Sequence, residues 1–156
     1  MKSTAGSFDD DLAECIQFPK NPFHPLVYIG GSPQIGKNVY IGAFSEINAK
    51  GAIVKIGDGC DIASFVSINV ADSHKRCIGL SADIERKDIV LEEKVFIGSY
   101  SFIKPGAHIG HHSVVAAGTI VEGVTIPPFS LVSGNPMQVR PGYYLSKFSK
   151  THDHTS

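Results

Sequence analysis

A six-residue repeat of large aliphatic residues runs through most of this 156-residue chain. Ile, Val or Leu stands at every repeat position of four runs: 29, 35, 41, 47 and 53; 56, 62 and 68; 91, 97, 103, 109, 115 and 121; 126 and 132. These are 16 positions, although the three residue types make up only 36 of the 156 residues. A period of six fits neither the 3.6-residue helical repeat nor a simple alternation along long strands. It predicts short strands joined by turns and stacked as the coils of a solenoid, three hexads to a coil.

The residues between the repeat positions support this interpretation. Gly often follows the aliphatic residue, and Gly relieves tight turns because it tolerates positive φ. The fourth residue after each repeat position is usually small, which suits an inward position near a corner: Ser45, Gly51, Cys60, Val66, Ser101, Ala107, Ser113, Thr119 and Ser130. Sixteen hexads predict roughly five coils.

Composition points to the same all-β class. The chain has 17 Ile and 13 Val but only 6 Leu, with 16 Gly and 9 Pro, and β-branched residues favour strands. With 14 Lys plus Arg against 15 Asp plus Glu, it lacks the positive charge that nucleic-acid or anionic membrane surfaces require. Three cysteines without a CxxC pair, and no long apolar run, predict a soluble cytoplasmic protein without disulfides.

The repeats divide the chain into three parts. Residues 1–26 form an N-terminal segment in which Asp9–Asp11 could open a short helix; residues 27–140 form the solenoid; residues 141–156 form a C-terminal helix, expected over 143–150, and a frayed tail. The repeat is interrupted at about 74–90, which is too polar to continue a coil. A long loop in a small domain is usually functional, so we expect a protruding loop there.

Four segments carry a family resemblance: IGKNVYIGAFSEINA, IGDGCDIASFVSI, VFIGSYSFIKPGAHIGHHSVVAAGTIV and the closing IPPFSLVSGNPMQVR. They resemble the hexapeptide-repeat, left-handed parallel β-helix of the acyltransferase superfamily. The closing run is similar to that of the sugar acetyltransferases, the group of galactoside and maltose acetyltransferases and polysaccharide O-acetyltransferases. The resemblance implies a left-handed helix, a homotrimer with active sites between subunits, and acetyl-CoA as co-substrate. The hexads alone also occur in carbonic anhydrases and in non-enzymatic scaffold proteins.

His74 stands six residues after Ile68, where the next aliphatic residue is due, directly before the loop. A polar residue that breaks the pattern there marks a candidate site. In the sugar acetyltransferases a similarly placed His is the general base, and imidazole is suited to take a proton near neutral pH. The family often has Pro directly after this His, whereas this chain has Lys75. The alternative is a loop histidine that caps a strand end.

Two further residues, one in the preceding coil and one just before His74, are candidates for binding the acceptor. Asn48 matches an acceptor-binding Asn of the galactoside enzymes; the alternative is an inward Asn satisfied by the coil backbone. Asp72 could orient His74 or bind substrate, but two residues apart on a strand the pair share a face only loosely, and this spacing favours a solvated carboxylate. Asn69 is undecided in the same way.

The resemblance also implies the coenzyme A contacts. Ser99 and Ala117 match family contact positions, Gly118 and Thr119 would flank the pantetheine channel, and Phe96 stands where the family often has Trp. The family Lys that holds the phosphates is missing, since Glu122–Ile126 precede Pro127 here. The phosphates would then need another basic residue: Lys104, Arg140, Lys147 or Lys150.

The seven histidines do not form a zinc pattern. The carbonic anhydrases of this fold need an H-x4-H pair, and the matching positions here are Ser99 and Lys104. We expect His111 and His112 to lie at turns and point to solvent, and we expect no metal.

The sequence therefore predicts an acetyltransferase that moves acetyl from acetyl-CoA to a hydroxyl or amino group of a nucleotide sugar or cell-surface polysaccharide. The alternative is a non-catalytic β-helix that serves as an assembly scaffold. Acetylation of serine is weaker, because 26 residues cannot supply the large helical N-terminal domain of the serine enzymes. Xenobiotic acetylation is also weaker, because those enzymes usually carry longer insertions.

Overall fold

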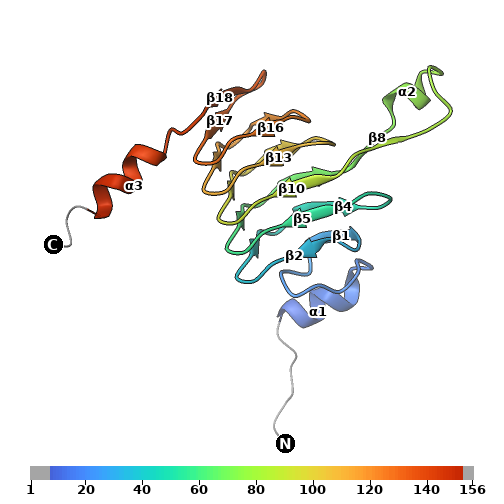
Figure 1. The fold of residues 1–156 in the computed structure, drawn as a ribbon. Helices are drawn as coiled ribbons and strands as arrows, with labels where there is room; N and C mark the ends of the chain where they lie inside the picture. The colour runs from blue at the N-terminus through green and yellow to red at the C-terminus, as the bar shows by residue number, and fades with distance from the viewer. Residues whose placement is uncertain (1–7, 153–156) are drawn as a thin grey trace, which may run out of the picture.

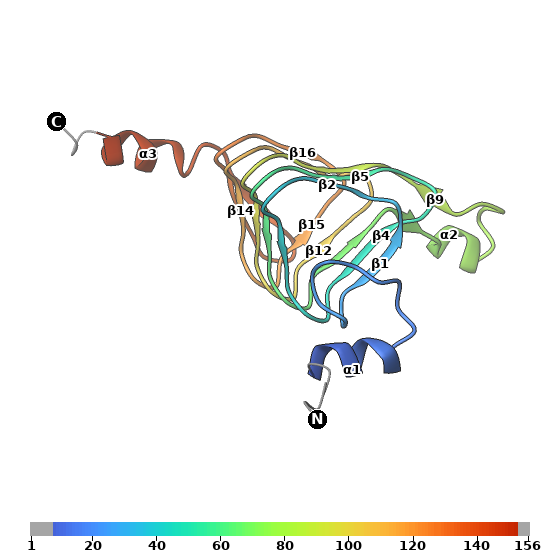
Figure 2. The ribbon, with the colours of Figure 1, turned by 90° about the horizontal axis from the view of Figure 1, so that it is seen from below.

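The computed structural model describes residues 8–152, and its body is a parallel β-helix of five coils. The coils stack along one axis (Figure 1), and seen along that axis they outline a three-sided prism (Figure 2). Each coil contributes one short strand to each of three parallel sheets, which we name A, B and C. This is the fold class that the hexads predict, with the predicted number of coils.

The strands of the three sheets have two to four residues each. Sheet A consists of β1 (Tyr28–Gly31), β4 (Glu46–Ala49), β7 (Ser67–Asn69), β12 (Phe102–Ile103) and β15 (Ile120–Val121). Sheet B consists of β2 (Gln34–Ile35), β5 (Val54–Ile56), β10 (Ile89–Leu91), β13 (His108–Ile109) and β16 (Thr125–Ile126). Sheet C consists of β3 (Tyr40–Ile41), β6 (Asp61–Ile62), β11 (Phe96–Ile97), β14 (Val114–Val115), β17 (Leu131–Ser133) and the antiparallel β18 (Gln138–Arg140).

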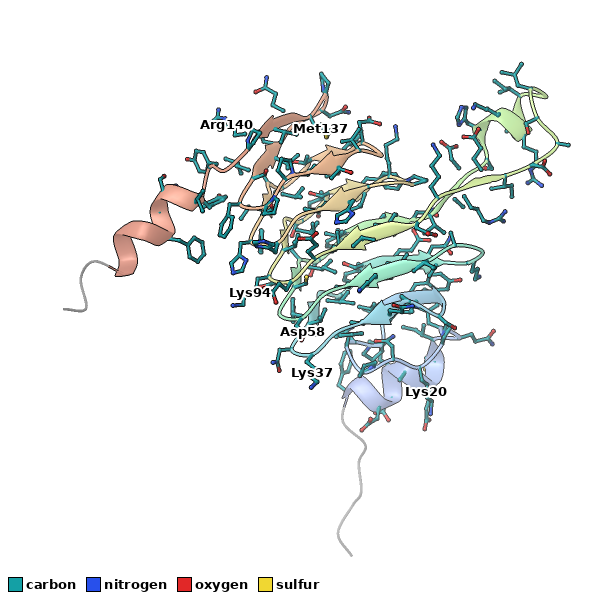
Figure 3. The ribbon with its side chains drawn as sticks, viewed as in Figure 1. Lys20, Lys37, Asp58, Lys94, Met137 and Arg140 are labelled. Carbon is teal, nitrogen blue, oxygen red and sulfur yellow. The ribbon has the colours of Figure 1, made fainter. Side chains whose placement is uncertain are left out.

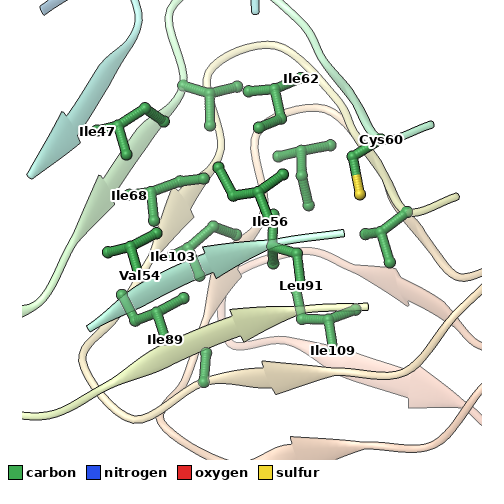
Figure 4. Close-up of a cluster of buried hydrophobic side chains, with 14 of the residues drawn as sticks. Ile47, Val54, Ile56, Cys60, Ile62, Ile68, Ile89, Leu91, Ile103 and Ile109 are labelled. Carbon is green, nitrogen blue, oxygen red and sulfur yellow. The ribbon is translucent and has the colours of Figure 1, made fainter. Parts of the chain in front are cut away.

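The aliphatic repeat residues form three columns inside the prism. In sheet A, for example, Ile47 pairs with Ile68, which pairs with Ile103, and all three are fully buried. Figure 4 shows these side chains meeting those of sheet B, including Ile56, in the core. Each coil therefore buries its aliphatic residues against its neighbours and cannot form a core alone.

One predicted repeat position is wrong. Ile53 is 51% exposed, and Ile56 instead pairs with Ile35 in the sheet B column. Nine residues, not six, separate the inward positions Ile47 and Ile56, because the turn between them holds three extra residues. Gly51, predicted to be inside, lies in the same insertion and is exposed.

The other small residues lie inside the corners as predicted. The hydroxyl groups of Ser45, Ser101 and Ser113 donate hydrogen bonds to backbone carbonyls of neighbouring turns. Among the described residues, every buried side-chain nitrogen or oxygen has a hydrogen-bond partner. Hydroxyl groups are tolerated in this core because the turn carbonyls accept their hydrogens.

Three helices lie outside the prism. The predicted short helix at the acidic patch is α1 (Phe8–Cys15), and the predicted C-terminal helix is α3 (Leu145–His152). Of the predicted frayed tail, residues 153–156 lie outside the described residues.

The predicted protruding loop is a hairpin arm. It has two antiparallel strands, β8 (Ala71–Asp72) and β9 (Glu85–Arg86), and the short helix α2 (His74–Cys77) near its tip. It leaves the prism at the corner where sheet A passes into sheet B, the A/B corner (Figure 2). The coil resumes at Ile89, slightly earlier than expected.

Candidate active site

Asp72 and His74 form a hydrogen-bonded pair on the arm. A single oxygen, Asp72 Oδ1, accepts the His74 backbone N–H at 3.0 Å and contacts imidazole Nδ1 at 2.6 Å. Asp72 ends β8 and His74 begins α2, so the turn between them brings the two side chains into direct contact. Asp72 thus contacts His74, as its candidate role requires, while its side chain stays 36% exposed to solvent.

The electrostatics of this pair suit a proton acceptor. Hydrogen bonds from the His74 backbone and then from its ring hold the pKa of Asp72 below its usual range, so the carboxylate is ionised at neutral pH. An ionised carboxylate on Nδ1 favours the tautomer with its proton on Nδ1 and a lone pair on Nε2. The His74 side chain is 60% exposed, so Nε2 is accessible to a substrate.

Two ion pairs lie near Asp72 and His74. Lys75 Nζ meets Glu85 Oε1 at 2.6 Å across the arm, and Lys104 Nζ meets Glu122 Oε2 at 2.6 Å on the neighbouring coils. A depression beside Asp72 is lined mostly by charged residues: Asp72, Glu85, Lys87, Lys104 and Glu122, together with Pro105 and Gly123. Its chemistry suits a polar, hydroxyl-rich ligand. Lys104, a candidate for holding phosphates, is committed here to Glu122.

Asn48 and Asn69 form an outward pair on sheet A. They are neighbours in register on β4 and β7, and the Asn48 amide donates to Asn69 Oδ1 at 3.3 Å. The side-chain oxygen Oδ1 of each Asn accepts a hydrogen bond from the backbone N–H two residues further along the chain. Asn48 accepts from Lys50, and Asn69 accepts from Ala71. The inward Asn considered from the sequence is wrong, because Asn48 lies between buried Ile47 and Ala49 and faces outward.

Ser99, Ala117 and Gly118 lie together at another corner, where sheet C passes into sheet A, the C/A corner. The Gly118 N–H donates to the Ser99 carbonyl at 2.9 Å, so the two turns stack directly. A Cβ at Gly98 would stand 2.5 Å from the Ala117 nitrogen, which explains why Gly is needed for this close approach. A Cβ at Gly118 would meet nothing within 4 Å, so the surface there is open to a ligand.

Two further residues that the resemblance places at the coenzyme site differ in how far their side chains are exposed. Thr119 is fully buried, and its hydroxyl donates to the Ala116 carbonyl at 2.6 Å. Its side chain is used inside the corner and does not face a channel. Phe96 on β11 points outward from sheet C and is partly exposed, as an apolar wall would require.

The basic candidates for the phosphates lie near the last coil. Arg140 is exposed on β18 (Figure 3), with its guanidinium 6.0 Å from the Tyr143 ring centroid. The Lys147 ammonium lies 4.3 Å from the same centroid. The side chain of Lys150 is outside the part that the structure describes.

The prediction that His111 and His112 point to solvent is wrong. Both are half-buried, and His112 stacks on Phe129 and meets the edge of Phe148 from α3. Burial lowers the pKa of His112, and the charges of Lys94 and His111 lower it further. Within residues 8–152 no three His, Cys, Asp or Glu side chains are grouped so that they could hold a metal ion.

The Asp72–His74 pair and the Ser99–Gly118 turns lie at different corners of one prism. The pair extends from the A/B corner, whereas the Ser99 turn lies between β11 and β12 and the Gly118 turn between β14 and β15, both at the C/A corner (Figure 2). The width of sheet A separates the corners, and its strand β4 has four residues, about 13 Å at the usual rise. Groups that react with each other must come within about 3.5 Å, so one protomer alone does not bring the two sets together.

Comparison with known proteins agrees with the fold. A family model described as bacterial transferase hexapeptide (six repeats) matches residues 88–123, and one described as hexapeptide repeat of succinyl-transferase matches residues 34–69. Galactoside O-acetyltransferase of Escherichia coli is 34% identical over 119 residues, which cover 74% of this chain and 57% of that protein. The chain thus spans little more than half the length of this relative.

Solved structures add two relatives. A galactoside acetyltransferase in complex with coenzyme A superposes with a TM-score of 0.68 at 32% identity, covering 80% of this chain and 63% of that one. A hexapeptide-repeat-containing acetyltransferase from Vibrio cholerae gives a TM-score of 0.63 at 25% identity, covering 88% of this chain and 83% of that one.

The repeats and the three-sheet prism define a left-handed β-helix of the hexapeptide-repeat class. The chain belongs to the hexapeptide-repeat transferase family, and the relatives described above are named as acetyltransferases, two of them as galactoside acetyltransferases. None of the helices among residues 8–152 has the length and apolar character needed to cross a bilayer.

Proposed function

We propose that the chain is an acetyltransferase that moves an acetyl group from acetyl-CoA directly to a hydroxyl or amino group of a sugar. The observation that carries this proposal is the 2.6 Å contact between Asp72 Oδ1 and His74 Nδ1 on the exposed arm. The polar depression beside the pair, and relatives named as galactoside acetyltransferases, support a sugar-type acceptor. We propose a nucleotide-linked sugar or a unit of a cell-surface polysaccharide.

The reaction needs one base and one oxyanion donor. His74 Nε2 takes the proton from the acceptor hydroxyl or amino group while its oxygen or nitrogen bonds to the thioester carbonyl carbon. A backbone N–H steadies the resulting oxyanion. The carbon–sulfur bond then breaks, the sulfur leaves with the bonding electrons, and the imidazolium returns the proton to it. The products are the acetylated sugar and free coenzyme A.

The residues of the C/A corner would hold acetyl-CoA. Open backbone at Gly118, the neighbouring Ser99 and Ala117, and the apolar ring of Phe96 would accommodate the pantetheine arm. Arg140 and Lys147 would meet the phosphates in place of the missing family Lys. Asn48, which faces outward on sheet A, would contact the acceptor.

The separation of the two corners supports a homotrimer. A neighbouring protomer that sets its C/A corner against this arm would bring Ser99 and Gly118 to His74 and complete the site. We also place the protein in the cytoplasm, where thiols such as those of Cys15, Cys60 and Cys77, which are unpaired here, remain reduced.

A mixing experiment tests this shared site. His74→Ala removes the base, and Ala117→Trp fills the open C/A corner; each variant alone should be inactive in release of coenzyme A thiol. Mixed oligomers of the two variants should regain partial activity, because some interfaces combine an intact His74 with an intact Ala117. Mixed oligomers that stay inactive would contradict a site between protomers. Unchanged turnover in His74→Ala would overturn the assignment of His74 as the base, and a wild-type protein without any turnover would favour the non-catalytic scaffold.

A further inference from the structure

The turn with three extra residues lies directly beneath the arm. This turn, residues 50–53, joins β4 to β5 at the A/B corner, and the arm leaves the same corner one coil further along the chain. Figure 1 shows the turn after β4 extending outward below the base of the arm. The insertion that carries Ile53 out of the core therefore faces the arm that carries His74.

Two side chains from the returning half of the arm bind this turn. Arg86 Nε donates a hydrogen bond to the Lys50 carbonyl at 3.2 Å, and Asp88 Oδ1 accepts one from the Ile53 backbone N–H at 2.8 Å. Lys50 and Ile53 are the two ends of the turn. The base of the arm is thus fixed at two points to a turn of the preceding coil.

Gly51 leaves room for the Arg86 side chain. A Cβ at Gly51 would stand 2.7 Å from both Cδ and Nε of Arg86, so any side chain at this position would displace the arginine. The φ of Gly51 is 82°, a conformation that Gly adopts readily. Arg86 can lie against the turn because position 51 carries no side chain.

Arg86 is connected to the candidate base through the short ladder of the arm. In register it pairs with Ala71, and the neighbouring pair is Asp72 with Glu85. The Asp72 carboxylate in turn holds the backbone and the ring of His74. A two-stranded hairpin is only marginally stable on its own, so the direction in which the arm projects depends on how its base is held.

We propose that Arg86 is a positioning residue for His74: by binding the Lys50 carbonyl it sets the angle at which the arm presents the imidazole to the acceptor. The inference rests on the proposed function, because it assigns a role in the reaction proposed above. Small displacements of a reacting group lower the rate of a reaction strongly. The role requires the donor at Nε and not the positive charge, because the carbonyl accepts from Nε.

Two substitutions separate the donor from the charge. In Arg86→Gln the amide nitrogen takes the place of Nε along the side chain, so a neutral residue can still donate to the Lys50 carbonyl, whereas Arg86→Met has similar length and no donor. Arg86→Met should lower kcat roughly 2- to 10-fold, the factor that one hydrogen bond contributes, and Arg86→Gln should restore most of this loss. The affinity for acetyl-CoA, measured by calorimetry, should be unchanged in both, because the proposed coenzyme residues lie at the C/A corner.

Gly51→Ala tests the same contact from the other side, with Gly59→Ala as its matched control. The new methyl group would displace Arg86, so Gly51→Ala should lower kcat as Arg86→Met does, and the double variant should lose no more than either alone. Gly59 also has a positive φ, 67°, but a Cβ there would meet only Lys94 Cγ, at 3.5 Å. Gly59→Ala should therefore show a similar backbone strain in its Tm and a wild-type kcat.

Thermal unfolding should show that all variants are folded at the assay temperature. Wild-type kcat in Arg86→Met, or equal losses in Arg86→Met and Arg86→Gln, would overturn the role of Arg86 while leaving the proposed function in place. A loss of kcat in Gly59→Ala as large as that in Gly51→Ala would also overturn it, because backbone strain alone would then account for the effect. A wild-type protein that transfers no acetyl group to any sugar would overturn the proposed function and, with it, this inference.

Discussion

The carboxylate of Asp72 receives two hydrogen bonds from a single residue, His74: one from its backbone N–H at 3.0 Å and one from its ring Nδ1 at 2.6 Å. The first fixes the turn that starts α2, and the second fixes the orientation and tautomer of the imidazole. One oxygen therefore sets both the position and the tautomer of the group that we propose as the base.

Substitutions in this pair should lower turnover without unfolding the protein. His74→Ala should reduce the rate of thiol release from acetyl-CoA by about 10²–10⁴-fold, the usual contribution of a positioned base. Asp72→Asn should cause a smaller loss, because the amide oxygen can still accept from the backbone and from Nδ1 but carries no charge to stabilise the imidazolium that forms. Rates with a panel of sugars and nucleotide sugars measure both effects.

Glu85→Gln is the control for these variants. Glu85 lies opposite Asp72 on the arm and pairs with Lys75, so the substitution changes charge nearby without touching the His74 ring. Because Glu85 also lines the depression beside Asp72, the KM for the acceptor is expected to change, whereas kcat should stay near that of wild type. A loss as large as that of Asp72→Asn would show that the arm responds to charge in general rather than to this hydrogen bond.

The columns of the core predict which aliphatic residues matter for stability. Ile68→Ala, in the middle of the sheet A column, should lower the free energy of unfolding by about 2–5 kcal/mol through the lost transfer energy and the cavity. Ile53→Ala, half-exposed in the insertion, should change it by less than about 0.5 kcal/mol. Urea denaturation compares the two. Equal losses would contradict the placement of Ile53 outside the columns.

Close stacking of turns makes Gly98 a second sensitive position. In Gly98→Ala the new methyl group would meet the backbone nitrogen of Ala117 at 2.5 Å, and backbone cannot rotate away. We expect a loss of about 1–3 kcal/mol in unfolding free energy, typical of overpacking. Gly118→Ala meets no neighbour and should lose less despite its positive φ. Thermal unfolding measures both variants. A Gly98→Ala protein that is as stable as Gly118→Ala, or more stable, would contradict the close stacking of the turns.

The depressed pKa of His112 predicts that the stability of the fold at its C-terminal end decreases in acid. Its pKa lies below the ordinary imidazole value of 6.5, chiefly because of burial, so the unfolded chain binds the proton more readily than the folded one. Stability from this group is therefore present above pH 6.5 and lost as pH falls through the lower folded pKa. His112→Asn, which suits the positive φ of 57°, should show a smaller drop in Tm between pH 7.5 and 5.5. An identical drop in both proteins would contradict this role.

The repeating part of the fold could be predicted from the sequence because each inward position, such as Ile68 or Ile103, carries the same physical requirement. The sequence also shows that the period shifts by three residues between Ile53 and Ile56. It could not show which residue leaves the column, because Ile53 keeps the six-residue interval and only the register of Ile35 with Ile56 places Ile53 in the insertion.

Predictions about the site depended on single residues, and they succeeded only where a residue's contacts lie close to it along the chain. His74 could be singled out as a candidate because it breaks the pattern at the edge of the loop. Its bond to Asp72 depends on a turn that spacing along a strand does not reveal. The aromatic surroundings of His112 come from Phe129 and Phe148, far along the chain, so a solvent-facing turn was the natural expectation.

Titration of the wild-type protein with acetyl-CoA in a calorimeter tests the central claim most directly. The account predicts micromolar binding with one molecule per protomer, accompanied by a higher Tm, and the same affinity in His74→Ala, since the base acts on the acceptor. No binding at millimolar acetyl-CoA would contradict the acetyltransferase assignment.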